Sequence, residues 1–553
     1  MKTIKNNIGL ILIALIILIG VNLIAGKVYK RFDITEDQRF TLSDATIDIV
    51  NNVEEEIMFD VLLKGNFPAE FKRLQLETRQ LLEEFSAVNP NIQFNFVNPL
   101  QDEANPEQLI QSMIKFGLTP ANVTVQENGK TSNETIFPWA IVNLGERSVR
   151  IPLLRNAYGT SDVERVNNSV QQLEYAFADG LKKLTLQEKK SLAVLKGHGE
   201  LDDKYLVDYL KEVGNYYRIG AFNLDSLAND SEKTLENLKR FDAMLVAKPT
   251  EKFNDRDKYI LDQYIMGGGK SMWLMDAVAI DLDSLNNEKF SNVTFPRDLN
   301  LNDLFFKYGI RINYNLVKDF SHTPAVVISR NGEEVPVEWL YSPLVQTNEN
   351  HPLTTNLNLV KLEFANQIDT LKNSINKTIL LKSSPKSKLS GAPAPINLFE
   401  FQKDLDESTY TNGDQNLGVL LEGEFTSGFK NRVKPIKLKS HLDQSQDNKM
   451  IVIADGDIVN YNTSNKQPLL NGVDRWTNQI FGNKDFLMNS INYLLDDNGL
   501  INIRSKEVKI GFLNKEKAAS ERTKWQLINI LLPLLLLGLF GGLNYLIRKK
   551  KYT

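Results

Sequence analysis

The stretch Ser191–Lys196, with the sequence Ser-Leu-Ala-Val-Leu-Lys, runs directly into residues 197–200, Gly-His-Gly-Glu. Four consecutive apolar residues before a glycine-rich turn predict a short strand that is buried on both faces. Residues 203–213 then predict a helix. A buried strand that leads through a tight turn into a helix opens a parallel α/β sheet. This stretch therefore decides the fold class of the larger part of the chain.

Downstream of this unit, strand and helix patterns keep alternating along the chain. Such alternation predicts a mainly parallel, doubly wound α/β sheet. Strand and helix patterns loosen after Tyr308 and become clear again from residue 417 onward. Residues 191–504 are therefore predicted to form one domain with a long insertion. The predicted strands cover residues 217–224, 243–247, 271–275, 417–421 and 450–454, and the predicted helices cover 255–266 and 484–495.

The insertion in this domain has looser patterning. Asn331 and Gly332 form a dipeptide that is typical of a tight hairpin turn. Residues 383–395 are rich in Ser, Pro, Lys and Ala and predict a mobile loop. Residues 426–449 contain a run of basic side chains and predict a solvated loop. If this loop faces a membrane, it could also contact lipid headgroups.

Residues 32–156 predict a first, smaller α/β domain. Its element order, β-α-β-α-β-β, is that of a thioredoxin-like domain, and its long helix has apolar positions recurring from Phe71 to Val88. The returning strands are predicted at residues 135–144 and 148–153. Because the chain has no cysteine, such a domain would serve as a scaffold or a binding surface and not as a redox enzyme.

Residues 157–190 are predicted to join the two domains through one helix. Ser161 and Glu164 have the spacing of a capping box, in which a hydroxyl and a carboxylate satisfy free amides at the start of a helix. Apolar residues then recur along one face of the predicted helix as far as Leu184.

The C-terminal part of the chain contains an uncharged apolar segment. Residues 526–547 include Leu-Ile-Asn-Ile-Leu-Leu-Pro-Leu-Leu-Leu-Leu-Gly-Leu-Phe-Gly-Gly-Leu-Asn-Tyr-Leu-Ile, which is long enough to cross a bilayer as a helix. Residues 548–553 begin with Arg-Lys-Lys-Lys, and this basic tail predicts a cytoplasmic C-terminus. Residues 505–525 are predicted to form a charged stalk before this span.

Residues 1–31 contain a second apolar segment, from Ile8 to Ala25. It is longer than the apolar region of a cleaved signal peptide and ends without a small-x-small cleavage pattern, so it predicts an uncleaved signal anchor. Two spans place both termini on the same side of a membrane. We therefore expect a bacterial inner-membrane protein with two spans, both termini in the cytoplasm, and the large domains in the periplasm.

The composition excludes several classes of function. The chain has 65 basic and 69 acidic residues, a formal charge of −4, and thus no basic excess for binding nucleic acid. The absence of cysteine excludes disulfides, thiol catalysis and thiolate metal sites. The four histidines are isolated from one another in sequence and form no His-rich metal motif. We therefore predict no metal site and no cofactor.

Residues 267–271, Gly-Gly-Gly-Lys-Ser, have a superficial likeness to a phosphate loop. That motif requires a glycine five residues before its final glycine, and Tyr264 occupies this position. The order of elements is also reversed, because a phosphate loop leads from a strand into a helix. These glycines instead predict the end of a helix. We therefore expect no nucleotide site in this chain.

Two short motifs could form a ligand site. His198 and Glu200 follow a predicted strand at the edge where open α/β sheets bind ligands, although glycines there also serve simply to make a tight turn. Asp455 and Asp457 follow another buried strand and could bind a hard cation. Two carboxylates are few ligands for such a cation, and a solvated loop is the simpler interpretation. The four residues are the ligand-binding candidates.

The C-terminal apolar segment could be either a plain anchor or a contact surface for a permease. Gly538, Gly541 and Gly542 would let another helix approach closely. Asn529 and Asn544 add amides that lipid cannot satisfy and that a partner helix could. These five residues are the predicted permease contacts.

A set of short motifs extends along nearly the whole chain between the terminal segments. In order they are Phe-Asp-Ile-Thr at 32–35, Arg-Phe-Thr-Leu-Ser at 39–43, Gly-His-Gly-Glu at 197–200, Trp-Leu-Tyr-Ser-Pro-Leu at 339–344, His-Pro at 351–352, Ala-Asp-Gly-Asp at 454–457 and Gly-Asn-Lys-Asp-Phe-Leu-Met-Asn at 482–489. The ordered set resembles the GldG family, the auxiliary, nominally substrate-binding subunit of gliding-motility ABC transporters in Bacteroidetes.

This resemblance implies a non-enzymatic subunit that works with a multi-span ABC permease and a cytoplasmic ABC ATPase. It further implies support of gliding motility, with protein secretion as an extension, and a periplasmic client that is not identified. The second domain would be amidotransferase-like without the catalytic cysteine. Membrane lipid is an expected partner, and a homo-oligomer remains open. Two alternatives also stay open: an anchored periplasmic hydrolase that uses His198 and Glu200, and a purely structural periplasmic scaffold.

Overall fold

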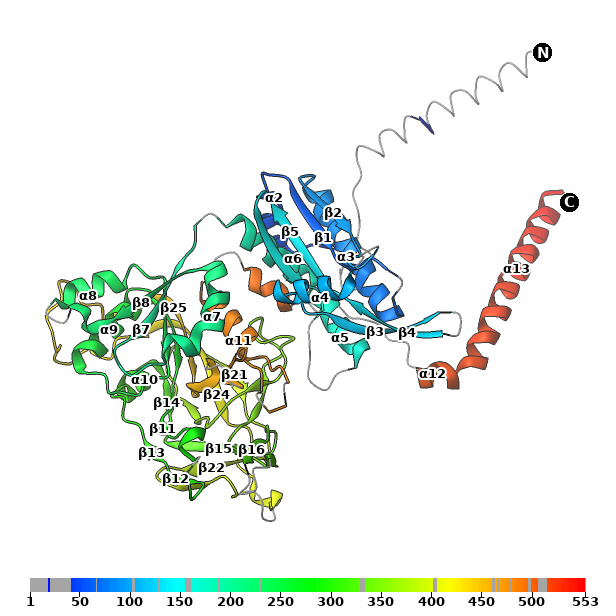
Figure 1. The fold of residues 1–553 in the computed structure, drawn as a ribbon. Helices are drawn as coiled ribbons and strands as arrows, with labels where there is room; N and C mark the ends of the chain where they lie inside the picture. The colour runs from blue at the N-terminus through cyan, green and yellow to red at the C-terminus, as the bar shows by residue number, and fades with distance from the viewer. Residues whose placement is uncertain are drawn as a thin grey trace. The chain divides into compact units, whose positions relative to one another are not determined.

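The structure is a computed structural model of the 553-residue chain. The residues that it describes are 18–19, 41–65, 67–101, 105–127, 130–154, 161–186, 188–227, 230–285, 287–328, 334–400, 405–459, 463–464, 467–474, 476–477, 479–495, 499–505 and 515–552. The chain divides into two compact units, Met1–Glu507 and Val508–Thr553. The first unit is of mixed α/β class, and its two larger sheets have four and nine strands (Figure 1).

The first sheet, coloured blue to cyan in Figure 1, has four strands in the order β2-β1-β5-β6. Its first two strands are parallel and the other two pairings are antiparallel. A separate antiparallel hairpin, β3–β4, precedes β5 in sequence. The strands are β1 (Ile57–Val61), β2 (Ile92–Phe96), β3 (Ala121–Glu127), β4 (Lys130–Ile136), β5 (Trp139–Leu144) and β6 (Arg147–Pro152). The predicted order β-α-β-α-β-β is present, but the strand predicted at 135–144 is wrong, because β4 ends at Ile136 and β5 begins at Trp139.

Helices cover this sheet and bury aromatic rings against it. The ring of Phe177, on α6, lies 5.4 Å from that of Phe59 on β1 and 6.5 Å from that of Phe85 on α3. All three side chains are fully buried. The helices of this part are α2 (Asp44–Asn51), α3 (Ala69–Val88), α4 (Pro106–Lys115), α5 (Asp162–Gln171) and α6 (Leu173–Thr185).

The segment predicted as one linker helix consists of two helices, which separate at Gln172. Ser161 and Glu164 form the predicted capping box at the start of α5, with both hydrogen bonds present. Helix α6 packs against β5 and β6, and it also contacts the second domain. There the Gln172 side-chain amide donates to the carbonyl of Asn356 at 2.9 Å, and Lys183 lies 3.3 Å from Glu212. The segment therefore belongs to the first domain's core while touching the second.

The second sheet has nine strands in the order β19-β18-β21-β24-β25-β10-β9-β7-β8. From β25 to β8 all neighbours are parallel, and from β25 to β19 all are antiparallel. The prediction of a mainly parallel sheet is thus correct for only half of the sheet. The strands are β7 (Ser191–Lys196), β8 (Arg218–Asn223), β9 (Ala243–Ala247), β10 (Lys270–Leu274), β18 (Leu344–Thr347), β19 (Val360–Lys361), β21 (Asn376–Lys382), β24 (Asn416–Thr426) and β25 (Gln444–Ile453).

Helices cover both faces of the parallel half. One face packs on α7 (Asp203–Tyr216) and α11 (Asn483–Leu495). The other face packs on α8 (Ser231–Leu238), α9 (Asp255–Met266) and α10 (Asn302–Tyr308). Successive strand residues alternate between these two cores, as pleating requires; on β9, Leu245 joins the first and Val246 the second. This half is doubly wound as predicted.

The last turn of α9 confirms that the Gly-Gly-Gly-Lys-Ser stretch ends a helix. The amide of Gly267 donates to the carbonyl of Gln263, and β10 follows from Lys270. Gly268 has a φ of 92°, a conformation that favours glycine. The chain thus passes from helix to strand here, opposite to a phosphate loop.

The predicted mobile loop at residues 383–395 is wrong. Strand β22 (Ser387–Gly391) pairs with β15 (Asn315–Asp319), and β23 (Pro395–Asn397) pairs with β12 (Ser291–Val293). The turn between β21 and β22 is held by buried Asp319, which accepts from the Ser384 amide at 2.7 Å. Low sequence complexity therefore coexists here with long-range pairing.

Small ribbons complete the insertion between β10 and β24. Residues 331–332, the predicted hairpin turn, lie outside the described residues, while β16 and β17 on either side of them pair antiparallel. The remaining short strands of the insertion are β11 (Val278–Ala279), β13 (Phe295–Pro296), β14 (Ile310–Ile312), β16 (Ala325–Ile328), β17 (Glu334–Val337) and β20 (Ile368–Thr370). Strands β26 (Thr463–Ser464) and β27 (Gln467–Pro468) follow β25.

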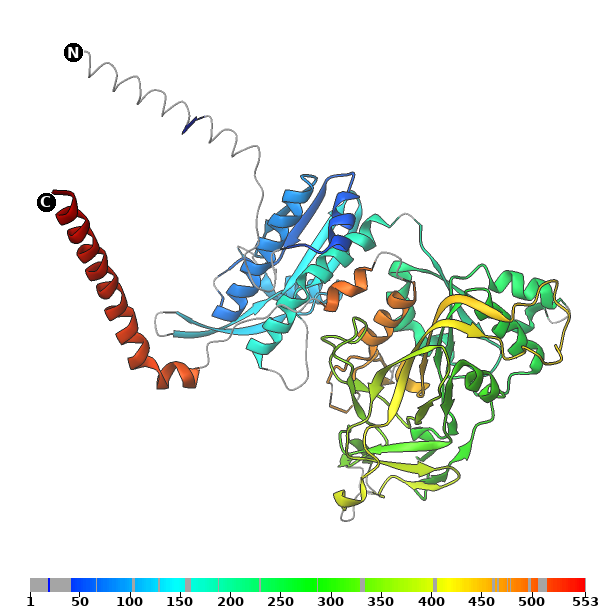
Figure 2. The same ribbon diagram turned by 180° about the vertical axis from the view of Figure 1, so that it is seen from behind.

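Strands β24 and β25 form a hairpin that is longer than predicted and is drawn in yellow in Figure 2. Only residues 427–443 of the loop predicted at 426–449 connect the two strands, because β24 ends at Thr426 and β25 begins at Gln444. Buried Asp262 on α9 fixes the start of this connection, accepting from the Ser427 hydroxyl at 2.6 Å and the Gly428 amide at 2.8 Å. Its basic residues are partly paired, Arg432 with Asp303 and Lys439 with Glu236.

The second unit contains α12 (Lys515–Ser520) and α13 (Arg522–Tyr552). Within the described residues, one helix is long and apolar enough to cross a membrane, Arg522–Lys550, and none of its apolar window is buried. Pro533 lies inside this helix without ending it. The predicted N-terminal span lies outside the described residues, apart from helical Leu18 and Ile19.

Candidate functional site

A cleft of about 670 Å³ opens at the carboxyl ends of the parallel strands of the second sheet. This is the edge at which open α/β sheets bind ligands. The turn after β7, the ends of β9 and β25, and the insertion all contribute to its wall. Its lining residues include Gly199, Glu200, Asp202, Tyr205, Lys248, Thr250, Asp281, Asp283, Ser284, Arg297, Thr323, Trp339, Ser342, Lys361, Glu363, Asp457 and Trp476.

The Gly-His-Gly-Glu turn after β7 is shaped by close packing. Gly197 and Gly199 have φ values of 112° and 69°. A Cβ atom on Gly199 would lie 2.1 Å from the Thr250 hydroxyl oxygen. The carbonyl of His198 accepts the amides of Thr250 and Glu251, each at 2.9 Å. The glycines thus let the turn dock on the segment after β9.

His198 lies beneath the cleft and is 3% exposed. Its ring stacks on Phe253 with centroids 3.9 Å apart, and its Nε2 lies 3.3 Å from the Asp257 carboxylate. Glu200 lines the cleft, and one of its carboxylate oxygens accepts the His198 amide at 2.7 Å. The His198 side chain contacts the Phe253 ring and the carboxylates of Asp257 and Glu200. A histidine beside two carboxylates is compatible with proton transfer, so the anchored-hydrolase alternative stays open.

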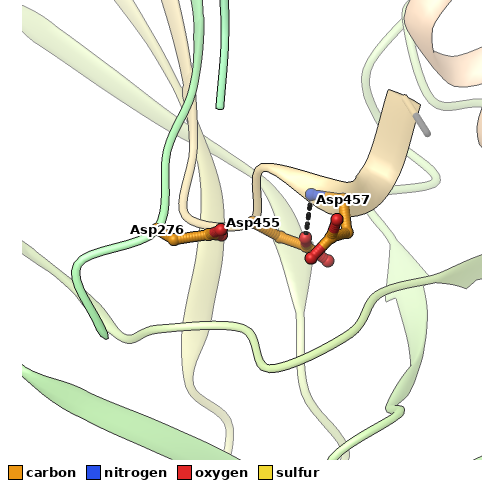
Figure 3. Close-up of side chains that lie close together, drawn as sticks. All are labelled: Asp276, Asp455 and Asp457. Carbon is orange, nitrogen blue, oxygen red and sulfur yellow. Dashed lines mark hydrogen bonds between the residues drawn. The ribbon is translucent and has the colours of Figure 1, made fainter. Parts of the chain in front are cut away.

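The structure adds a third carboxylate, Asp276, to the predicted pair Asp455 and Asp457. One carboxylate oxygen from each of the three residues lies within 4.8 Å of the other two, and Figure 3 shows the three side chains together. Asp276 follows β10, the neighbour of β25, so parallel pairing brings the two strand ends together. One Asp455 oxygen accepts the Asp457 amide at 2.7 Å, drawn as a dashed line in Figure 3. The other accepts the Glu363 amide at 2.7 Å.

Lys248, which sequence reasoning missed, is the cation of this cluster. Its ammonium lies 2.6 Å from both oxygens of Asp457, 2.8 Å from Asp281 and 3.7 Å from Asp276. A Cβ atom on Gly456 would lie 2.5 Å from the Cγ atom of Lys248, so the glycine of the Asp-Gly-Asp motif makes room for the lysine stem. The available signal was the position of Lys248 directly after buried β9, at the same sheet edge.

Burial and charge set the protonation of these groups. Burial raises the pKa of Asp276 to about 6, although the Lys248 ammonium pulls in the opposite direction. Burial also raises the pKa of Asp455 well above its ordinary range, reinforced by the charges of Asp457 and Asp276. Burial alone would lower the pKa of Lys248, but Asp457, Asp276 and Asp281 together raise it. Lys248 therefore stays charged at neutral pH.

The three carboxylates could supply oxygen ligands to a hard cation. However, the Lys248 ammonium already lies among them, and backbone amides occupy one oxygen of Asp276 and both oxygens of Asp455. A divalent cation would have to displace the ammonium. The arrangement is that of a buried ion-pair network.

The insertion forms the opposite wall of the cleft. The Thr323 hydroxyl donates to that of Ser342 at 2.8 Å, and Trp339 packs against Tyr341 with ring centroids 5.3 Å apart. Trp339 and Ser342 belong to the Trp-Leu-Tyr-Ser-Pro-Leu motif at 339–344. Of the four predicted ligand-binding residues, Glu200 and Asp457 line the cleft, whereas His198 and Asp455 are not among its lining residues.

The predicted permease contacts lie on α13. Cβ atoms placed on Gly538, Gly541 and Gly542 would meet nothing within 4 Å, so these positions are open in the described part of the chain. Asn529 and Asn544 are exposed on the same helix.

Comparison with known proteins supplies a family match. Residues 189–490 match the model of a family described as an ABC-type uncharacterized transport system, and residues 36–143 match a domain of unknown function. An uncharacterized protein of Borreliella burgdorferi is 21% identical over 413 residues, which are 73% of this chain and 74% of that protein. A solved structure, the mmIFT52 N-terminal domain, is 11% identical with a TM-score of 0.31, covering 56% of this chain and 98% of that one. A TM-score this low carries no argument.

Proposed function

This chain belongs to the ABC-type uncharacterized transport system family of auxiliary proteins, and we propose that it is the membrane-anchored, non-enzymatic accessory subunit of an ABC transporter. In this role it binds a multi-span permease, whose cytoplasmic ATPase partner supplies the energy. The family match, which covers the complete parallel half of the second sheet, carries the proposal. The finer parts, gliding motility and protein secretion, rest on the resemblance to the GldG family.

The exposed apolar helix α13 supports an anchored role. Its segment Arg522–Lys550 contains an 18-residue window with a mean hydropathy of 2.1, and none of that window is buried. An apolar helix of this length is costly to leave in water and is stable across a bilayer. The basic residues that end the helix favour a cytoplasmic C-terminus and therefore an extracytoplasmic, periplasmic position of the α/β domains. From there the domains would either relay motion from the membrane helices to an extracytoplasmic client or present cargo.

The partner is tested by purifying the full chain from membranes of its native cell and identifying what co-purifies. We expect a multi-span permease and an ABC ATPase in a constant ratio. A second copy of this chain alone would indicate a homo-oligomeric scaffold instead, and it would contradict the accessory role.

The helix surface is tested by the double variant Gly538→Leu, Gly542→Leu. The two glycines are four residues apart and share one face of α13, so bulky side chains there would separate closely packed backbones. We expect normal insertion but loss of the permease from the purified complex. The matched control, Leu535→Ile with Leu539→Ile, has the same spacing without added bulk and should keep the permease. If the glycine variant retains the permease at the normal ratio, α13 is only an anchor.

The topology is tested with reporter domains. A reporter after Thr553 should be active only in the cytoplasm, and one inserted beside Val433 only in the periplasm. Val433 is 93% exposed in the connection between β24 and β25, which makes it a better insertion point than the paired segment 383–395. Activity of both reporters in the same compartment would contradict the proposed topology.

A further inference from the structure

The charges that line the cleft are mostly paired within the protein. Lys248 is bound by Asp457 and Asp281, and Lys361 lies 2.7 Å from Asp474. Glu200 accepts a backbone amide, and Asp202 lies 3.3 Å from Lys204. These contacts hold the walls of the cleft together, although the Oε1 atom of Glu200 is buried without a hydrogen-bond partner.

Two charged residues of the cleft are different. In the part of the chain that the structure describes, neither Arg297 nor Asp283 makes a hydrogen bond through its side chain or an ion pair within 4.0 Å. The Nε atom of Arg297 is buried and lacks an acceptor, which is unfavourable for a charged donor. The two residues also do not pair with each other. The Arg297 charge acts on buried Asp276, whose pKa it lowers, but it makes no hydrogen bond there, and the two opposite charges face one wall of the cleft.

The backbone holds both residues on one rigid arm beside the buried cluster. The Arg297 amide donates to the carbonyl of Ala277 at 2.7 Å, next to Asp276. Strand β13, which precedes Arg297, pairs with β11, and Asp283 follows β11 in a short 3-10 turn, Leu282–Leu285. Because this arm continues directly from β10, the charged pair is fixed at the carboxyl edge of the sheet.

The other lining residues restrict the ligand further. Asp202, Asp281, Asp283, Glu200, Glu363 and Asp457 face three cations, Lys248, Arg297 and Lys361, so a polyanion such as a nucleotide would be repelled. Because acidic side chains outnumber basic ones in the lining, a ligand whose single carboxylate binds Arg297 must also carry a positive charge that offsets the repulsion. The volume of about 670 Å³ suits a small organic molecule, and Tyr205, Trp339 and Trp476 add aromatic surface.

We propose that the cleft binds a small zwitterionic ligand, an amino acid or short peptide, with its carboxylate on Arg297 and its ammonium group at Asp283. A planar guanidinium matches a carboxylate through two parallel hydrogen bonds. The inference goes beyond the accessory role and does not depend on it, because it concerns a cleft in the α/β domain and not the membrane helix.

Calorimetric titration of the purified full chain in detergent provides the test. The probes are the standard L-amino acids, glycylglycine and alanylalanine, and the comparison compounds are acetate, methylamine and ATP. We expect at least one zwitterion to bind with a Kd below about 1 mM and each comparison compound to bind at least about tenfold more weakly. If no zwitterion binds in that range, or if ATP or acetate binds as well, the proposal is wrong.

Two single variants test whether Arg297 and Asp283 bind the ligand. Arg297→Gln and Asp283→Asn should each weaken the zwitterion by about tenfold or more. The controls, Arg311→Gln and Asp369→Asn, break an ion pair on β14 and β20 whose residues do not line the cleft, and they should change the affinity less than about twofold. Unchanged affinity in both cleft variants would contradict the assignment.

A further comparison distinguishes direct binding by Arg297 from a purely structural effect. It uses the C-terminal amide of the zwitterion that binds most tightly, because this amide lacks the carboxylate charge. The wild-type chain should prefer the free acid, Arg297→Gln should lose this preference, and Asp283→Asn should keep it. A preference that survives in Arg297→Gln would show that the carboxylate does not bind there. Since co-purification of the permease is measured separately, failure of this proposal and failure of the accessory role give different results.

Discussion

The two sheets of the first unit differ at the carboxyl edge of their parallel strands. In the first domain, β1 and β2 end beside a small pocket of about 220 Å³, whose wall includes Leu62, Phe67 and Phe137. In the second domain, the corresponding edge opens into a cleft of about 670 Å³ lined mainly by charged and hydroxyl side chains. The first two strands of each sheet form a β-α-β unit, β1-α3-β2 and β7-α7-β8, so the difference lies in the residues that follow each strand.

The same β-α-β arrangement thus ends in an apolar, packed edge in one sheet and in a charged, open edge in the other. Leu62 and Phe137 join Met113 and Leu118 in an apolar cluster that closes the edge of the first sheet. Lys248, Asp276 and Asp457 hold the edge of the second sheet by ion pairs and leave an open volume above it. Fold alone therefore does not assign a function, and the two strand edges differ in polarity. We infer that the first domain contributes packing surface and the second contributes recognition.

The largest expected effect tests the packing role of the first domain. Phe177→Ala removes a fully buried ring that contacts Phe59 and Phe85, and it should lower the free energy of unfolding of this domain by about 4–5 kcal/mol. Hydrogen exchange read over β1 and β5 provides the measurement, and binding in the cleft should not change. Val163→Ala, at a 47% exposed position on α5, is the control, with an effect within about 0.5 kcal/mol. A similar loss in both variants would contradict the packing argument.

The second effect tests the buried charges of the second domain. Lys248→Met leaves Asp457 and Asp276 without their cation, and we expect a loss of about 3–4 kcal/mol in the free energy of unfolding, measured with denaturant. Lys252→Met is the matched control, because this lysine is 60% exposed where it pairs with Asp298. It should change stability by less than about 1 kcal/mol. Equal losses would mean that the network at the strand ends is not structural.

The third effect is a pH dependence of the same edge. The pKa of Asp276 rises from an ordinary 3.8 to about 6 on folding, so the folded state binds more protons than the unfolded state between these values. Its stability should therefore fall as the pH rises from about 4 to about 6, by about 3 kcal/mol, and then level off.

Asp276→Asn removes this titration while keeping an oxygen for the Gly456 amide. We expect a flatter stability profile between pH 4 and 6 in this variant, measured by denaturant unfolding at each pH, and higher stability than the wild type at pH 7. An unchanged slope in the variant would assign the effect to other carboxylates, with Asp455 the first to test because burial raises its pKa in the same direction.

The smallest effect concerns a local signal in the first domain. Ser161→Ala removes the side-chain cap of α5 and should cost about 1 kcal/mol of that domain's stability, measured by thermal unfolding. Ser161→Asp keeps an acceptor at the cap and should lie close to the wild type. If alanine and aspartate behave alike, the capping box contributes nothing, and the helix is held by packing alone.

Local patterns predicted those elements whose causes lie within a few residues. Apolar runs predicted β7 and β9, the serine and glutamate spacing predicted the cap of α5, and glycine placement predicted the end of α9. Glu200 was a ligand-binding candidate because it follows a strand at the edge where open sheets bind ligands, and Asp457 because its carboxylate could bind a hard cation; both line the cleft. The apolar content of residues 526–547 predicted α13 for the same reason, since length and hydropathy are local properties.

Patterns failed where a distant strand decides the conformation. Residues 383–395 look like a loop because they lack apolar alternation, yet they pair with β15 and β12, about 70 and 100 positions away in sequence. Lys248 looks like an ordinary lysine before a proline, and only its approach to Asp457, 209 positions later, gives it a role. Arg297 and Asp283 lacked any motif, because an unpaired charge is recognised only after the partners of all its neighbours are known.

By itself, the sequence determined the α/β class, the doubly wound parallel half, the terminal apolar helix and the absence of thiol chemistry, because these follow from residue type and short-range periodicity. The tertiary structure alone decided the antiparallel half of the nine-stranded sheet, the ion-pair network under the cleft and the two charges left open within it. The physical reason is that pairing register and burial bring together residues from distant parts of the chain. Their charges interact only when folding removes the water between them.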